Sequence, residues 1–273
     1  MLAVTGATGH VGGLVAGLVA DLSPRLVVRD ASRAPAGFEV RACSYDDHAA
    51  SASALQGVSV LFMVSASESA DRRLEHRTFV RAAADAGVRH VVYTSFLGAA
   101  PDAGFALARD HFDAELAIRQ SGMAFTFLRD NFYLDALAFY ADASGVYRGP
   151  AGSGRVSGVA RADVADVADA VLRSPHQHAG SSYDLTGAEA LTFAEIAART
   201  GAALGRSMSY HEETVEEAYA SRRTAWPDAP DWQLDAWVST YTAIRNGELD
   251  RISRDVERVA GHPPRRLEDV FTR

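Results

Sequence analysis

The fold is decided by one stretch of sequence, Thr5-Gly6-Ala7-Thr8-Gly9-His10-Val11-Gly12. A short apolar run, Leu2–Thr5, leads into it, and apolar residues at helical spacing follow from Val11 to Asp21. In such a loop the first glycine allows a tight turn and the second lets backbone N–H groups approach a phosphate. The third lets the helix pack closely on the sheet. The stretch therefore predicts a strand–loop–helix unit that binds a dinucleotide pyrophosphate through Gly6, Ala7, Thr8, Gly9, His10, Val11 and Gly12.

Apolar strands alternate with amphipathic helices along the first half of the chain. The predicted strands are 25–28, 38–42, 58–64, 88–94 and 124–128, and the predicted helices are 70–86 and 105–120. This alternation is typical of an α/β fold in which helices cover both faces of a parallel sheet, a Rossmann-type doubly wound arrangement. Ligands of such folds bind at the carboxyl ends of the strands. The search for a site is thereby narrowed to the segments that follow each strand.

The pattern becomes less regular after about residue 145, where glycine is more frequent. We predict an NAD(P)-binding Rossmann domain over residues 1–145, completed by a later strand around 181–185. A smaller α+β lobe over residues 146–273 is expected to cover the substrate. Whether the tryptophan-containing region 212–246 acts as a lid is left open.

Composition excludes several kinds of chemistry. All 27 basic residues are arginine, so a Schiff-base lysine, a P-loop lysine and a lysine general base are absent. The net charge of -8 argues against a nucleic-acid partner, which would need a basic face. The one cysteine, Cys43, excludes a disulfide framework and a multi-cysteine metal site, and no metal site is expected.

The sequence also bears on location. No apolar run approaches the roughly 20 residues that span a bilayer, so no membrane association is expected. A strand-like run already begins at Leu2, which leaves no room for a signal peptide. We therefore expect a cytoplasmic protein. Its oligomeric state is not fixed by the sequence, and a homodimer is one assembly that stays open.

The end of the second strand indicates which dinucleotide is bound. An acidic residue there suits the ribose 2′-hydroxyl of NAD, whereas an arginine suits the 2′-phosphate of NADP. The strand ends Val28-Arg29-Asp30, and Arg29 is best placed to contact a phosphate. A shifted register would turn Asp30 inward instead. We predict NADP(H) as the cofactor. The alternative is that Arg29 and Asp30 form a solvated charged turn without a role in cofactor binding.

The catalytic positions depart from a common pattern. Thr94 and Ser95 follow the fifth strand, where the nicotinamide ring is expected, and short-chain dehydrogenase/reductases commonly have a serine there. Those enzymes also use Tyr-x-x-x-Lys, in which the lysine lowers the tyrosine pKa. This chain has no lysine, so the standard acid–base pair is absent. That excludes the usual alcohol dehydrogenase mechanism.

Several motifs together resemble one family. They are TGATGHVG (5–12), VRD (28–30), YTSFLGA (93–99), DHFDAEL (110–116), SGMAFTFLRDNFY (121–133) and YDLTG (183–187). The chain is similar over nearly its whole length to the NmrA-like branch of atypical short-chain dehydrogenase/reductases. Within it, the bacterial NAD(P)H:quinone oxidoreductases of type 2 look most alike. The resemblance implies NADPH binding and, in the enzyme members, reduction of quinones or related conjugated acceptors.

The resemblance also implies site residues. His111 and Glu115 stand where a histidine and a glutamate commonly replace the tyrosine and lysine. His111 is then either a proton relay oriented by Glu115 or a histidine on the helix surface near Asp110 and Asp113. The segment 44–47 either contacts the adenine or forms a turn. Beside the glycine loop and Arg29, the candidates are Ser95, His111 and Tyr133 for catalysis and Ser65, Ala66, Thr94 and Asn131 for the cofactor. Asn131 alternatively caps the following helix.

Three functions are compatible with these features. The first is an NADPH-dependent oxidoreductase that transfers hydride to a quinone-like or conjugated carbonyl acceptor. A quinone fits the missing lysine, because its reduced anion is far less basic than an alkoxide. The second is an NADP(H)-sensing regulatory protein without turnover, and the third is a dedicated natural-product reductase. The aromatic segment 125–140 favours an apolar substrate pocket over a regulatory interface.

Overall fold

The computed structural model describes residues 1–137 and 140–271. Its main feature is a seven-stranded sheet with the order β3-β2-β1-β4-β5-β6-β9. The strands are β1 (Leu2–Thr5), β2 (Arg25–Val28), β3 (Glu39–Ala42), β4 (Val60–Met63), β5 (His90–Phe96), β6 (Ala124–Asp130) and β9 (Ser181–Leu185). The pairs β1–β2, β1–β4, β2–β3 and β4–β5 are parallel. The predicted Rossmann-type α/β fold is confirmed, and the strand expected at 181–185 is β9.

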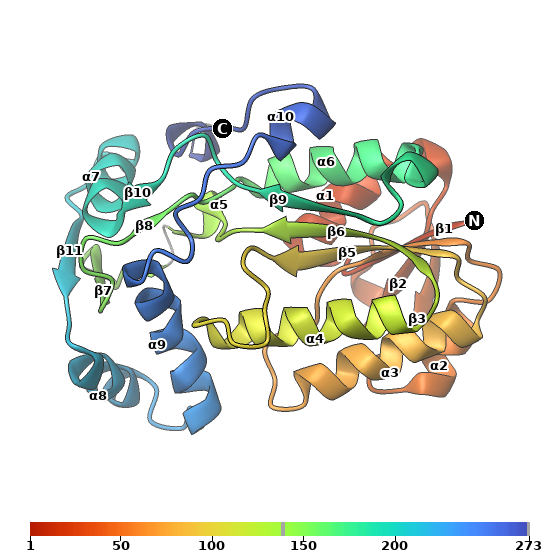
Figure 1. The fold of residues 1–273 in the computed structure, drawn as a ribbon, viewed down its shortest axis with the longest axis horizontal. Coiled ribbons are helices and arrows are strands. Elements are labelled where there is room, and N and C mark those ends of the chain that lie inside the picture. The colour runs from red at the N-terminus through yellow and green to blue at the C-terminus, as the bar shows by residue number, and fades with distance from the viewer. Residues whose placement is uncertain (138–139, 272–273) are drawn as a thin grey trace. The chain divides into compact units, whose positions relative to one another are not determined.

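Helices cover both faces of this sheet. They are α1 (His10–Leu18), α2 (His48–Ala54), α3 (Arg72–Asp85), α4 (Ala106–Gln120) and α6 (Arg161–Arg173). In Figure 1, α1 and α6 lie on one face, and α2, α3 and α4 lie on the other. The central strands β1, β2, β4 and β5 are buried on both sides for this reason, whereas the edge strand β3 is mostly exposed. The side chains of Phe62, Phe79, Tyr93 and Phe127 are fully buried.

The chain forms two compact units, each assembled from three segments. The first unit comprises Met1–Phe96, Asp110–Arg129 and Arg161–Tyr183. The second comprises Leu97–Arg109, Asp130–Ala160 and Asp184–Arg273. The chain therefore crosses between the units several times, whereas the sequence pattern predicted one boundary near residue 145 and a single later strand, 181–185, that returns to the first domain.

The second unit contains both helices and short strands. Its two small sheets pair β7 (Val146–Gly149) with β11 (Ser209–Glu212) in parallel and β8 (Arg155–Val156) with β10 (Leu191–Thr192) in antiparallel fashion. Its helices are α5 (Leu134–Leu137), α7 (Phe193–Leu204), α8 (Val215–Ala225), α9 (Asp231–Arg245) and α10 (Asp255–Ala260).

The starts of α7 and α8 follow from local sequence. Thr192 and Glu195 form a capping box at α7, and Thr214 and Glu217 form another at α8. Each box satisfies backbone N–H groups that a helix start leaves unpaired. Within the described part of the chain, no helix has the length and apolar character needed to cross a membrane.

Candidate active site

The turn from β1 into α1 requires glycine at two positions. Gly6 has a φ of +64°, in the left-handed region, and a Cβ there would lie 2.9 Å from the Cβ of Val64. At Gly12 a Cβ would lie 2.3 Å from the carbonyl oxygen of Gly6. A side chain at Gly12 would therefore push α1 away from the strand. The turn is as tight as the glycine spacing predicts.

The N-terminus of α1 is suited to an anion. Gly9 is the N-cap residue, no side chain caps the helix, and its first turn carries no acidic residue. Unpaired N–H groups and the positive end of the helix dipole therefore meet at His10 and Val11. This set of donors fits a pyrophosphate, which needs several N–H groups within a short distance.

The turn after β2 separates the roles of its two charged residues. The Asp30 carboxylate accepts hydrogen bonds from the backbone N–H and the hydroxyl of Ser32, at 2.9 and 2.6 Å. These bonds cap the short 3₁₀ helix Ala31–Arg33 and lower the pKa of Asp30. Asp30 is thus occupied by its own turn. Arg29 is exposed, and its guanidinium makes no ion pair with any described residue.

The loop after β4 is held by side chains from three other elements. The backbone N–H groups of residues 64, 65 and 66 each donate to a side chain. The acceptors, in order, are Oγ1 of Thr5 at 2.8 Å, Oγ1 of Thr94 at 2.9 Å and Nε2 of His76 at 2.8 Å. Nε of Arg72 also donates to the carbonyl oxygen of Ala66 over 3.0 Å. The predicted cofactor residues Ser65 and Ala66 therefore lie in one ordered loop, and the predicted residue Thr94 contacts it from β5.

The segment 44–47 follows β3, and two of its residues support the fold instead of facing the adenine contacts considered for this segment. The Tyr45 hydroxyl lies 2.7 Å from the carbonyl oxygen of Val64 and 2.7 Å from Oγ1 of Thr5. Its ring stacks on Phe79 with centroids 3.9 Å apart, and burial raises the pKa of the phenol. Asp47 accepts from the N–H of Ala50 as the N-cap of α2. Tyr45 and Asp47 are therefore committed to contacts within the fold.

His111 is buried, so the surface position considered for it is wrong. Its side chain lies at the centre of a polar network in which Nη2 of Arg72 is 3.1 Å from Nε2. A guanidinium can only donate, so Nε2 is the unprotonated nitrogen. The neutral ring then carries its proton on Nδ1 and donates it to the Tyr93 oxygen, 3.1 Å away. Burial, followed by the charge of Arg72, holds the pKa of His111 well below its usual range.

Glu115 is bonded to other residues than His111, so the structure lends no support to the predicted orientation of His111 by Glu115. It accepts a hydrogen bond from the Ser95 hydroxyl at 2.7 Å and a bidentate pair from Arg129 at 2.7 and 2.6 Å. Ser95 and Glu115 are both buried. Because the Ser95 hydroxyl proton already points to a carboxylate, its oxygen can offer only lone pairs to a ligand. Ser95 is thus placed as an acceptor rather than as a proton donor.

Both the nitrogen and the oxygen of the Asn131 side-chain amide are hydrogen-bonded to residues of the second unit. Its nitrogen donates to Oγ of Ser157 and to the carbonyl oxygen of Leu249, both at 3.0 Å. Its oxygen accepts the N–H of Phe132 at 2.8 Å. Phe132 precedes the first residue of α5, Leu134, so this hydrogen bond does not cap the helix. The alternative role of Asn131 as the helix cap is therefore wrong. Asn131 shapes the chain where β6 ends.

Asp130 is a buried acid that sequence reasoning missed. It is the last residue of β6, is 4% exposed, and receives the hydroxyl of Tyr133 on Oδ2. Burial raises the pKa of Asp130 to about 7, and the Tyr133 hydrogen bond acts in the opposite direction. The predicted strand ended at residue 128, so Asp130 was read as part of a loop. Its neighbour Tyr133, by contrast, was among the candidates.

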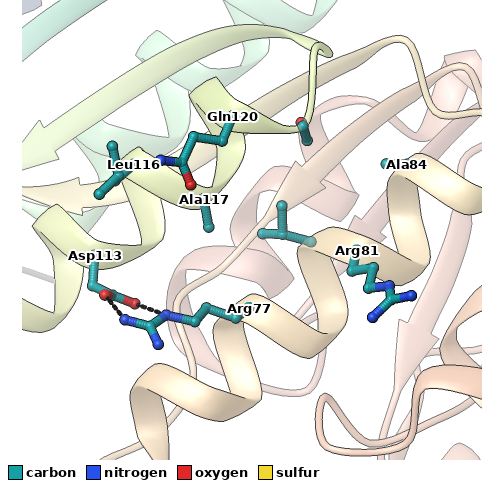
Figure 2. Close-up of a pocket in the computed structure, with 9 residues that line it drawn as sticks. Arg77, Arg81, Ala84, Asp113, Leu116, Ala117 and Gln120 are labelled. Atoms are coloured by element: carbon teal, nitrogen blue, oxygen red, sulfur yellow. Dashed lines mark hydrogen bonds and ion pairs between the residues drawn. The ribbon is translucent and has the colours of Figure 1, made fainter.

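A groove on the first unit lies apart from these residues. It has a volume of about 390 Å³ and lies between α3 and α4, as Figure 2 shows. Arg77 spans it and pairs with Asp113, while Val80 and Leu116 contribute apolar surface. None of the predicted site residues lines it. The groove is therefore a separate surface feature and not the dinucleotide site.

Known proteins resemble the chain in sequence and in structure. Quinone oxidoreductase 2 of Escherichia coli (strain K12) is 32% identical over 96% of this chain and 94% of that protein. A (4-alkanoyl-5-oxo-2,5-dihydrofuran-3-yl)methyl phosphate reductase of Streptomyces griseus subsp. griseus is 34% identical over 98% of this chain and 96% of that protein. The crystal structure of the Escherichia coli NADPH-dependent quinone oxidoreductase QOR2 complexed with NADPH superposes with a TM-score of 0.90, covering 99% and 98% of the two chains at 32% identity.

These similarities extend over nearly the full length of each protein, and they confirm the resemblance to quinone oxidoreductases found in the sequence motifs. The family model described as NAD(P)H-binding matches residues 6–175, a range that includes the glycine loop, Arg29 and the ends of β4, β5 and β6. The chain belongs to the NAD(P)H-binding family.

Proposed function

We propose that the protein is an NADPH-dependent oxidoreductase that transfers hydride to a quinone-like or conjugated carbonyl acceptor. The observation that carries the cofactor assignment is the turn after β2. Asp30 is occupied by Ser32, whereas Arg29 is exposed and without an ion-pair partner among the described residues. An unpaired arginine beside an occupied carboxylate favours a 2′-phosphate over a bare ribose.

The residues that hold the cofactor follow from the same geometry. The pyrophosphate would lie at the start of α1, against the glycine loop 6–12, with Arg29 on the 2′-phosphate. The ordered loop at Ser65 and Ala66, braced by Thr94, would border the nicotinamide half. The bound nicotinamide supplies the hydride, and the protein supplies orientation and exclusion of water.

The acceptor class follows from what the chain lacks. Without lysine it lacks the tyrosine–lysine pair through which short-chain dehydrogenase/reductases commonly protonate an isolated carbonyl. A quinone or another conjugated carbonyl accepts hydride more readily, and its reduced anion needs a weaker acid. Both similar proteins described above are named as reductases or oxidoreductases, which supports turnover over a purely regulatory role.

A dedicated natural-product reductase is the second candidate. The Streptomyces griseus relative is named for a dihydrofuranone phosphate, a conjugated carbonyl compound. Its chemistry of hydride transfer to a conjugated acceptor is the same as for a quinone. The two candidates therefore differ in the acceptor and not in the mechanism.

The experiment is a matched measurement of binding and turnover. Binding constants for NADPH and NADH are compared by titration, and NADPH oxidation is followed against benzoquinones, naphthoquinones and an unsaturated lactone. We expect tighter binding of NADPH and turnover with at least one acceptor class. Tighter binding of NADH would contradict the cofactor assignment. Tight NADPH binding without turnover on any acceptor would favour the regulatory function.

A further inference from the structure

We infer that Asp130, hydrogen-bonded by Tyr133, is the acid that delivers a proton to the oxygen of the reduced acceptor. This inference rests on the proposed function and names a catalytic residue that completes it. The chain lacks the tyrosine–lysine pair that supplies this proton in related mechanisms. Asp130 would supply it from the carboxyl end of β6, the edge at which ligands of doubly wound sheets bind.

The two oxygens of Asp130 lie in different surroundings. Oδ2 takes the hydrogen bond from Tyr133, which comes from the segment leading into α5. Oδ1 is buried and has no hydrogen-bond partner among the described residues. Buried polar atoms without a partner are rare and mark places where a ligand or water completes the bonding. Oδ1 is thus the atom of this carboxyl whose hydrogen bonding is left for a ligand or a water to complete.

Among the described residues, no arginine forms an ion pair with this carboxyl. Arg129, the preceding residue, donates two hydrogen bonds to Glu115. Successive side chains of a strand point to opposite faces, so Asp130 faces away from that pair. Asn131, the following residue, is bonded to Ser157 and Leu249. The titratable group that faces Asp130 is Tyr133, and no charged side chain is among the causes of its pKa shift.

Burial without a counter-charge keeps a carboxyl group in its acid form. The pKa of Asp130 is raised to about 7, so the acid form persists close to neutrality. With Oδ2 accepting from Tyr133, the proton of the acid form resides on Oδ1. That is the oxygen without a protein partner, so the acid presents a donor that no other residue uses.

In the other buried candidates, every available proton is already held in a hydrogen bond within the protein. His111 accepts from Arg72 at one nitrogen and directs its single proton to Tyr93 at the other. The Ser95 proton is directed to Glu115, and Glu115 is paired with Arg129. Each of these groups would have to break an internal bond before it could protonate a ligand. Asp130 would not.

In the proposed step the acceptor receives a hydride with its electron pair from the reduced dinucleotide, whose C–H bond breaks and which is thereby oxidised. The hydride forms a new bond to the conjugated acceptor, and the displaced π electrons reside on the acceptor oxygen as an oxyanion. The Oδ1–H bond of Asp130 breaks, and the proton forms an O–H bond with that oxyanion. The carboxylate left behind keeps the Tyr133 hydrogen bond, and a proton from water restores the acid. One NADPH and one proton are consumed for each acceptor reduced by two electrons.

The main variant is Asp130→Asn, which keeps the size of the side chain and removes the acid. In the wild type we expect kcat to fall as the pH rises through about 7, where Asp130 ionises. The variant should lose at least about 100-fold in kcat, the usual contribution of a general acid. Its remaining activity should be independent of pH over the same range, and its NADPH affinity should be unchanged.

Tyr133→Phe provides the second variant. The Tyr133 hydroxyl lowers the pKa of Asp130 by stabilising the carboxylate, so its removal should move the fall in kcat to higher pH. The matched control is Asp228→Asn, an exposed carboxylate of the same unit, which should leave both kcat and its pH profile unchanged.

A spectroscopic readout does not depend on turnover. Infrared difference spectra of the cofactor-free protein, taken below and above pH 7, should show a protonated carboxyl band that titrates near neutrality. The band should be absent in Asp130→Asn and present in Asp228→Asn. If it is absent in the wild type, or remains in Asp130→Asn, the acid form does not belong to Asp130 and the inference fails.

The outcomes separate this inference from the proposed function. Turnover by the wild type together with an unchanged pH profile in Asp130→Asn would overturn the inference and leave the function standing. Absence of turnover on every acceptor would overturn both. If Asp130→Asn does not fold, the direction of the profile shift in Tyr133→Phe decides: a shift to lower pH, or none, contradicts the inference.

Discussion

The guanidinium of Arg72 donates to Nε2 of His111 over 3.1 Å, and this contact fixes the protonation state of the histidine. A cation that can only donate requires a neutral imidazole with its proton on Nδ1. The helix α4, whose His111 was a candidate catalytic residue, thereby contributes a buried structural contact. Arg72 also holds the carbonyl of Ala66, so the same contact is linked to the loop after β4.

The first prediction concerns His111→Ala. Because both ring nitrogens are engaged within the protein, the variant should keep the wild-type pH dependence of kcat/KM. It should lose about 1–3 kcal/mol of unfolding free energy, since a buried Arg72 donor is left without its acceptor. Urea denaturation and quinone kinetics check both parts. His176→Ala, at an exposed site, is the control. A changed pH profile would support the hypothesis that His111 is a proton relay.

The second prediction uses two glycines of one helix. A Cβ at Gly12 would lie 2.3 Å from the carbonyl oxygen of Gly6, whereas a Cβ at Gly17 would have nothing within 4 Å. Gly12→Ala should destabilise the protein and weaken NADPH binding. Gly17→Ala should stabilise it by up to about 1 kcal/mol, the helix propensity of alanine over glycine. Thermal denaturation with and without NADPH measures both. Equal behaviour of the two variants would contradict the packing argument.

Selectivity between dinucleotides provides the third prediction. Arg29→Ala removes the proposed contact to the 2′-phosphate, and a hydrogen bond to a charged group contributes about 1.5–3 kcal/mol. We therefore expect the Kd for NADPH to rise about 10- to 100-fold while the Kd for NADH stays the same. Arg41→Ala, which removes an exposed arginine paired with Glu39, should change neither constant. Equal losses for both dinucleotides would count against the role of Arg29.

The fourth prediction is a pH dependence of stability. The pKa of Asp130 rises from 3.8 to about 7 on folding, so the folded state binds more protons between these values. Its contribution to stability is therefore retained below about pH 4 and lost as the pH rises through about 7. Asp130→Asn removes this loss and should be the more stable protein above pH 7, by at most about 4 kcal/mol.

Denaturation midpoints measured on both sides of this pH range test that sign. Asp228→Asn, whose carboxylate is exposed, should show no such difference. A variant that is more stable and at the same time less active would indicate that the buried acid is retained for function. If Asp130→Asn loses stability at high pH, the carboxyl is ionised and compensated in the folded state.

Much of the fold could be predicted from the sequence, because buried parallel strands are continuous apolar runs and the glycine loop leads directly from strand into helix. The helix α2 was missed, since its Ala- and Ser-rich segment His48–Ala54 lacks apolar periodicity. The end of β6 was placed too early, because Arg129 and Asp130 interrupt an apolar run. Polar residues at a strand end resemble a loop until their pairing is known.

The site was predictable in its cofactor half and less so in its catalytic half. Glycine geometry is local, so the loop could be read directly. The burial of His111 and Glu115 was signalled, since they share a helical stripe with Ala114 and Ile118, which are fully buried. The partners Arg72 and Arg129 come from other elements and have no local signature. The burial of Asp130 depends on tertiary packing alone.

The loop after β4 has a consequence for the protein before any cofactor binds. Its three consecutive amides at residues 64–66 are each bonded to a side chain of a different element. Each hydrogen can exchange with solvent only after its own hydrogen bond to β1, β5 or α3 opens. A dinucleotide therefore meets a surface whose conformational entropy has already been lost in folding, and its binding enthalpy is not offset by ordering this loop.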